Sequence, residues 1–138
     1  MSDNSLHNIL LLAAGIASFW DGFTTVFGTA TILGGGVAAG IAGLLFGLLI
    51  MSLMLNSKRV IETSTDSFEG MLFRVLWFIA VFYDLYTSWL GNQEFILGQD
   101  ASGSRIAVLI GLTLLVSGSP VLVSFLWNKK QGATPTAL

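Results

Sequence analysis

The sequence contains one segment twice, as FWDGFTTVFG at residues 19–28 and as FYDLYTSWLG at residues 82–91. Phe, Asp, Thr and Gly recur at identical offsets, and further aromatic and hydroxyl side chains recur in kind. Each copy places one carboxyl group, that of Asp21 or Asp84, inside an otherwise apolar run. We therefore interpret the rest of the chain as the setting of these two aspartates.

The composition indicates a membrane protein. Of the 138 residues, 10% are charged and 54% are hydrophobic, whereas charged residues make up about 25% of an average soluble domain. A water-soluble fold could not cover its surface with so few charges, so we expect lipid to form part of the solvent. The net charge of −2 argues against a nucleic-acid partner.

Four apolar segments are long enough to cross a bilayer, at residues 8–33, 37–55, 71–90 and 106–127. A helix needs roughly 20 residues to span a hydrocarbon core, and only helices satisfy their own backbone in lipid unless a barrel closes. Because no alternating barrel pattern is present, the sequence predicts an all-α integral membrane fold with four transmembrane helices in a single domain. Residues 131–138 are predicted to form a disordered tail.

The repeated segment predicts two tandem helical hairpins, residues 8–55 and 71–127. A unit with an even number of spans returns to its starting side, so both copies would insert in the same orientation, as a parallel internal repeat. The glycine triplet at residues 34–36 predicts the tight turn inside the first hairpin, because glycine accepts the backbone angles of a reversal.

Basic residues predict the orientation. Four of them lie on one side of the predicted spans, Lys58, Arg59, Lys129 and Lys130, and Arg105 lies on the other. The positive-inside rule then places both termini and the middle loop in the cytoplasm, with the protein in an inner or plasma membrane.

Small residues form stripes at helical spacing on all four predicted spans. On the first and third spans the stripes include the aspartates: Ala14, Ser18, Asp21, Thr25 and Gly28, and Ala80, Asp84, Thr87 and Gly91. Such stripes let helices approach closely in lipid, so we expect them to face inward. The candidate packing glycines are Gly28, Gly36, Gly40, Gly43, Gly47, Gly91, Gly111 and Gly118.

Pro120 predicts a kink in the fourth span, because proline removes a backbone donor. This kink is interpreted either as a bend that accommodates packing or as a hinge whose free carbonyl lines a polar path.

The two aspartates need partners or a use, because a charged residue at the centre of a spanning helix costs about 2.5–3.5 kcal/mol. The nearest candidate partners in the same segments are hydroxyls, those of Thr24, Thr25, Thr87 and Ser88. Three hypotheses follow. The aspartates bond helices together, or they meet and form a proton or cation site with the hydroxyls as further ligands, or they pair with a basic residue of a membrane partner.

The sequence predicts a protein that is not an enzyme. It has no cysteine and one histidine, so it offers no thiolate or histidine cluster for a metal and no nucleophile–base arrangement; no cofactor and no metal site are predicted. Small size and small-residue stripes favour a homo-oligomer or an accessory subunit of a membrane complex. The paired aspartates favour a small oligomeric channel or transporter for protons, cations or a small solute. Size alone also allows a holin-like pore.

Overall fold

The computed structural model describes residues 3–63, 67–96 and 102–131, and this part of the chain contains helices and no strand. The helices are α1 (Asp3–Ile32), α2 (Gly36–Leu55), α3 (Ser57–Glu62), α4 (Phe68–Ile96) and α5 (Gly103–Gln131). The four long helices cover the four apolar segments, and the short α3 adds a helix that the sequence did not predict. Gln131 ends α5, and the rest of the predicted tail lies outside the described residues.

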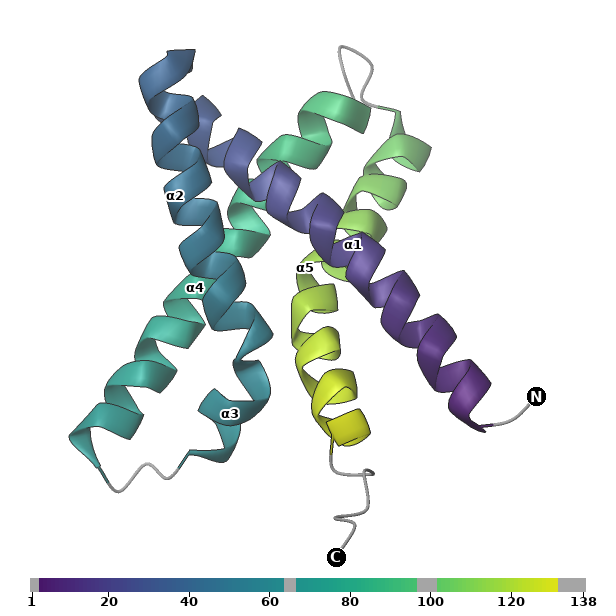
Figure 1. Ribbon diagram of the computed structural model, residues 1–138. Helices are drawn as coiled ribbons and strands as arrows, with labels where there is room; N and C mark the ends of the chain where they lie inside the picture. The colour runs from purple at the N-terminus through teal and green to yellow at the C-terminus, as the bar shows by residue number, and fades with distance from the viewer. Residues whose placement is uncertain (1–2, 64–66, 97–101, 132–138) are drawn as a thin grey trace, which may run out of the picture.

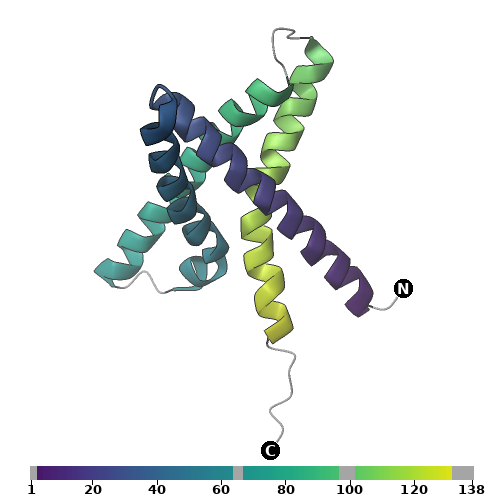
Figure 2. The same cartoon turned by 45° about the horizontal axis from the view of Figure 1, so that its top comes forward.

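The long helices run alternately up and down between two ends of a bundle (Figure 1). The start of α1, the end of α5 and the short α3 lie at one end, and the α1–α2 turn lies at the other with the C-terminal end of α4. α1 crosses both α4 and α5 in Figure 1 and again in the turned view of Figure 2, and it contacts α2, α4 and α5. α1 is therefore the helix against which the other three pack.

A glycine turn joins α1 to α2, as the sequence predicts. Gly34, Gly35 and Gly36 have φ angles of 86°, 76° and 85°, in the left-handed region that favours glycine. The N–H of Gly35 donates to the carbonyl of Ala30 over 2.9 Å, which closes the end of α1. Gly36, expected to pack between helices, is the exposed first residue of α2, and a Cβ there would meet nothing within 4 Å.

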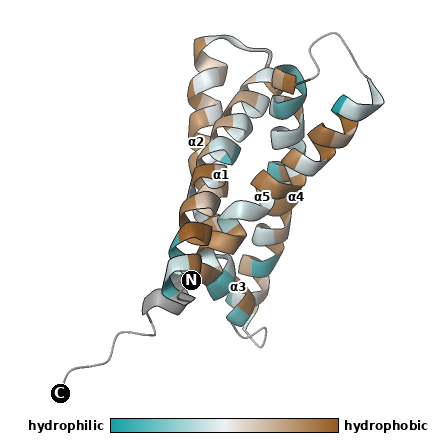
Figure 3. Cartoon of the chain, turned by 90° about the vertical axis from the view of Figure 1, so that its right-hand side faces the viewer, coloured by the Kyte–Doolittle hydropathy of each residue, from teal (hydrophilic) through white to brown (hydrophobic). Residues whose placement is uncertain are grey.

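Three of the long helices are long and apolar enough to cross a membrane within the described chain, Asn4–Ile32, Gly36–Leu55 and Gly103–Trp127. Figure 3 shows hydrophobic residues along the long helices and hydrophilic residues around α3. α4 is not among the three, and it carries Glu69, Arg74, Asp84 and Glu94. The fold is therefore all-helical with three candidate spans, while the fourth span stays a prediction.

Large apolar side chains lie on the outside of the bundle. Phe19 is 80% exposed, Val37 83% and Phe82 69%, and contiguous apolar surface of this kind is rare on soluble monomers. The inside is instead rich in small and polar side chains, with Asp21, Thr24, Asp84 and Asn92 at 2% exposure or less. This distribution suits a bundle that is surrounded by lipid.

The two inward stripes predicted on the first and third segments are confirmed. Every residue of both stripes is buried, from Ala14 to Gly28 on α1 and from Ala80 to Gly91 on α4. Four of the candidate packing glycines lie where a Cβ would meet a neighbouring helix closer than 3.0 Å: Gly28, Gly43, Gly47 and Gly91. Small residues at these positions therefore allow the helices to approach closely.

The other candidate glycines lie away from such contacts. A Cβ added at Gly40, Gly111 or Gly118 would meet no atom of a neighbouring element within 4 Å. The buried face of α2 recurs every three or four residues, as one face of a helix does. It is formed by Ala39, Gly43, Gly47, Ile50 and Met54. Ala39, and not its neighbour Gly40, therefore lies on this face. The inward small-residue stripe predicted on the fourth segment is wrong, because Gly111 and Gly118 are exposed and the buried face of α5 carries larger or polar side chains such as Leu109 and Thr113.

Pro120 lies inside α5, which continues as a helix to Gln131. A proline at this position leaves the carbonyl of Val116, four residues earlier, without its helical donor. The hydroxyl of Ser119 donates to that carbonyl over 2.6 Å and also lies 3.0 Å from the hydroxyl of Ser18 on α1. The freed carbonyl therefore has a partner within its own helix.

Candidate functional site

The two aspartates of the repeated segment meet where α1 crosses α4. Asp21 on α1 is 1% exposed and Asp84 on α4 is 2% exposed. The hydroxyls of Thr25 and Ser88, which bond Asp84 and Asp21 respectively, lie 3.2 Å apart and so link the two carboxyl groups. The sequence placed both on inward stripes, but only the crossing of the helices brings them into one site.

Hydroxyl groups from three helices donate to the carboxyl oxygens. Ser88 of α4 donates to Oδ1 of Asp21 over 2.8 Å, and Ser117 of α5 donates to the same oxygen over 3.2 Å. Thr25 of α1 donates to Oδ1 of Asp84 over 2.8 Å. Each carboxyl is thus held by a helix other than its own.

The contacts between α1 and α4 are reciprocal. Asp21 accepts from Ser88, one turn beyond Asp84, and Asp84 accepts from Thr25, one turn beyond Asp21. The four residues occupy matching positions in the two copies of the segment, at 21 and 25 and at 84 and 88. The two copies therefore contact each other through equivalent side chains.

The other two hydroxyls predicted for the site, those of Thr24 and Thr87, do not donate to either carboxyl group. Thr24 lies 3.1 Å from the Ser88 hydroxyl and donates to the backbone carbonyl of Asp21 over 3.0 Å. Thr87 donates to the backbone carbonyls of Tyr83 and Asp84. Its side chain thus satisfies its own helix and reaches neither carboxyl group.

One carboxyl oxygen has no hydrogen-bond donor. Oδ2 of Asp84 is buried and has no partner within the described chain. A buried acceptor without a donor costs roughly 1–3 kcal/mol, and more if it is charged. The site is therefore incompletely satisfied at this oxygen.

Within the described residues, the electrostatic interactions of the two carboxyl groups involve no basic side chain. Arg74 donates instead to the carbonyls of Ile61 and Thr63, at 2.9 and 2.7 Å. No group of three or more His, Cys, Asp or Glu residues that could hold a metal ion occurs in the same part of the chain. The partners of the carboxyls are hydroxyls and each other.

Two members of this buried polar cluster were missed at the sequence level. Asn92 accepts from the indole N–H of Trp20 over 2.9 Å and donates to Thr113 on α5 over 3.2 Å. Its signal was its place one turn after Ser88, on the same face as Asp84. Ser117 had no comparable signal, because several hydroxyl residues of the fourth segment were equally plausible.

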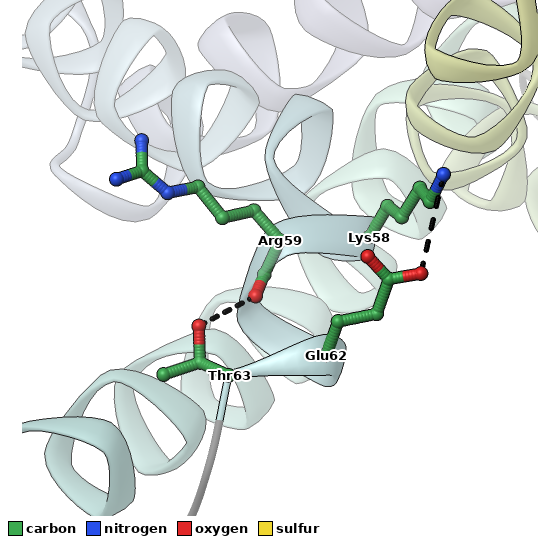
Figure 4. Close-up of a pocket in the computed structure, with 4 residues that line it drawn as sticks. All are labelled: Lys58, Arg59, Glu62 and Thr63. Carbon is green, nitrogen blue, oxygen red and sulfur yellow. Dashed lines mark hydrogen bonds and ion pairs between the residues drawn. The ribbon is translucent and has the colours of Figure 1, made fainter. Parts of the chain in front are cut away.

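A separate polar hollow lies on the surface of α3 (Figure 4). Lys58 pairs with Glu62 at 3.9 Å, and Thr63 donates to the carbonyl of Arg59 over 2.7 Å. The guanidinium of Arg59 points away from the other three side chains. An exposed ion pair of this kind contributes little to stability, and the hollow shares no residue with the aspartate site.

The described residues form a helical protein with three candidate membrane spans and a buried pair of carboxyl groups. Comparison with protein-family models, curated proteins and solved structures finds no match for this chain. Its function must therefore be inferred from the chemistry of the site.

Proposed function

We propose that this protein is a small membrane channel or transporter that binds a proton or a monovalent cation at Asp21 and Asp84. The observation that carries the proposal is a pair of buried carboxyl groups that two hydroxyls link to each other, one of which has an oxygen without a donor. Two carboxylates in a low-dielectric interior repel each other strongly. A bound positive charge would offset that repulsion and supply the missing partner.

The surroundings support this proposal. Ionisable residues inside membrane proteins face the bundle interior and mark ion or proton pathways when they are not structural. Here both acids are buried among the hydroxyls of α1, α4 and α5. Four helices enclose little room, so we propose that the protein works as an oligomer with four transmembrane helices in two co-oriented hairpins.

A second candidate is a non-enzymatic accessory subunit in which the aspartates only bond helices together. The reciprocal bonds from Thr25 and Ser88 favour it, because each of them links α1 to α4. Hydrogen bonds between helices in lipid contribute about 0.6 kcal/mol on average. In this alternative, the helix packing would be stable enough to offset the free-energy cost of leaving Oδ2 of Asp84 without a donor.

Flux measurements separate the two candidates. Purified protein is placed in vesicles, and proton and cation flux is recorded for the wild type, Asp21→Asn, Asp84→Asn and the control Glu94→Gln. Glu94 is an exposed acid near the end of α4, so its variant controls for the loss of one negative charge. Transport predicts flux in the wild type and the control, and its loss in both aspartate variants.

The oligomer mass of each variant is measured in parallel. Flux that disappears while the oligomer stays intact supports transport. A wild type without flux, together with aspartate variants that dissociate or unfold, contradicts transport and supports the accessory role.

A further inference from the structure

A row of four oxygen atoms connects the two carboxyl groups. It runs from Oδ1 of Asp84 through the hydroxyls of Thr25 and Ser88 to Oδ1 of Asp21, with separations of 2.8, 3.2 and 2.8 Å. All four residues are 2% exposed or less. Each of the three links joins α1 to α4, so the row exists only in the folded bundle.

The number of hydrogens in this row is one short. Three links between four oxygens need three hydrogens, and each hydroxyl supplies one. If both carboxyls are ionised, the two hydroxyl hydrogens point outward to the carboxylates. The contact between Thr25 and Ser88 then has no hydrogen. One added proton on either carboxyl completes all three links.

We propose that the carboxyl pair holds a single proton and that Thr25 and Ser88 relay it between Asp84 and Asp21. This inference rests on the proposed function and names the proton as the ion. In one transfer the O–H bond of Asp84 breaks as its proton passes to Thr25, the Thr25 proton passes to Ser88, and the Ser88 proton bonds to Asp21. Three O–H bonds break and three form, and the row keeps one negative charge throughout.

The unpaired oxygen of Asp84 is a second and independent indication. With Asp84 ionised, Oδ2 would be a charged acceptor that is buried without a donor, which is costly. A proton on Asp84 removes that charge.

A metal cation fits the same atoms less well. Calcium takes about six to eight oxygen ligands, and hydroxyls that coordinate a metal turn their lone pairs toward it. Here Thr25, Ser88 and Ser117 all donate their hydrogens to carboxyl oxygens. This is the arrangement with both carboxyls ionised, in which the hydroxyls turn hydrogens, and not lone pairs, toward the carboxyl oxygens and to which one proton can be added.

Few other titratable groups surround the pair in the described structure. α2 carries none, and α5 contributes only Arg105 among its described side chains. On α4 the phenol of Tyr83 lies 3.0 Å from the hydroxyl of Thr29, which itself donates to the Thr25 carbonyl. The proton is thus assigned to the two carboxyls.

Infrared spectroscopy of the intact protein in vesicles tests the proton directly. A protonated carboxyl absorbs at a frequency distinct from that of a carboxylate. We expect its band in the wild type and its loss in Asp84→Asn, with no change on replacing potassium by sodium. A wild type without the band, or one whose carboxylate bands shift with sodium, overturns the proposal.

Two hydroxyl deletions test the relay. Thr25→Val and Ser88→Ala each remove one link, and Thr31→Val is the matched control because Thr31 is an exposed hydroxyl on α1 that bonds only its own helix. We expect a shift of the protonated-carboxyl band in both deletions and none in the control. Proton flux should fall by about tenfold or more, the effect of a barrier raised at one link. A band unaffected by both deletions overturns the relay.

The two proposals fail separately. If the wild type carries no flux, the transport function fails, and the infrared bands still decide whether a proton is held and bonded to the hydroxyls. If flux depends on both aspartates but not on Thr25 or Ser88, transport survives and the relay is wrong. Circular dichroism and oligomer mass identify any variant that has not folded.

Discussion

Gly28 on α1 lies so close to the backbone of Thr87 on α4 that a Cβ on it would collide with that backbone unless the helices shifted. The reverse contact also exists, because a Cβ on Gly91 of α4 would lie 2.7 Å from the carbonyl oxygen of Thr24 on α1. The two glycines occupy the same position in the two copies of the repeated segment. This close crossing brings the hydroxyls of one helix within reach of the carboxyl group of the other.

Substitution of Gly28 is expected to weaken the crossing. The obstacle to a methyl group is helix backbone, which cannot rotate away, so Gly28→Ala should lower the free energy of unfolding by about 1–3 kcal/mol. The measurement is reversible unfolding in mixed detergent and dodecyl sulfate micelles. Gly111→Ala is the control, since Gly111 has open space around it; it should be neutral or stabilising by up to about 1 kcal/mol through helix propensity. Equal losses at both positions would contradict the close crossing.

Asn92 is expected to stabilise the bundle through its two partners. Asn92→Ala leaves the indole N–H of Trp20 and the hydroxyl of Thr113 without their present bonds, so unfolding should become easier by about 1–3 kcal/mol. Gln93→Ala removes a similar but exposed amide from the next position and should change little. The same unfolding assay compares them, and a neutral Asn92→Ala would show that these bonds contribute nothing.

Ser119 and Pro120 are expected to be energetically coupled. Ser119→Ala removes the donor to the carbonyl of Val116, while Pro120→Ala restores the backbone N–H that can take its place. Ser119→Ala should therefore destabilise the wild type more than it destabilises Pro120→Ala, by about 1 kcal/mol in a double-mutant cycle. The contact of Ser119 with Ser18 is lost in both arms and cancels. Strict additivity would mean that the hydroxyl does not replace the missing N–H.

Cysteine labelling is expected to decide whether α4 spans the membrane. The chain has no native cysteine, so Ser67→Cys before α4 and Ser102→Cys before α5 can be labelled singly in sealed vesicles with an impermeant maleimide. Both positions are exposed. A spanning α4 predicts that only one of the two reacts before the vesicles are opened. Equal reactivity at both would contradict four spans and leave the three candidates that length and composition support.

The helical class and the inward faces could be predicted from the sequence because both depend on local periodicity. An apolar run of about 20 residues favours a helix in lipid wherever it packs. A stripe of small and polar residues at spacings of three and four occupies one face of that helix. The burial of Asp21 and Asp84 followed from these two facts and from the repeated segment.

Packing partners could not be predicted in the same way. Gly40 and Gly43 both fit a small-residue stripe, yet only Gly43 meets α1. The buried face of α2 passes through Ala39 and not Gly40, and a difference of one residue turns a side chain by about 100°. Ser117 bonds Asp21, but nothing in its own segment distinguishes it from Ser119 or Ser124. The crossing geometry of the helices decides which helix packs against which stripe. That geometry cannot be predicted from the local sequence.

The sequence by itself determined that the chain is helical, apolar outside, and equipped with two acids on inward faces. Only the tertiary structure decided that these acids meet, that Thr25 and Ser88 bond across to them, and that one oxygen of Asp84 has no donor. The physical reason is the range of the forces involved. Helix formation is satisfied within four residues, whereas a hydrogen bond between residues 25 and 84 requires two backbones to approach within a few ångströms.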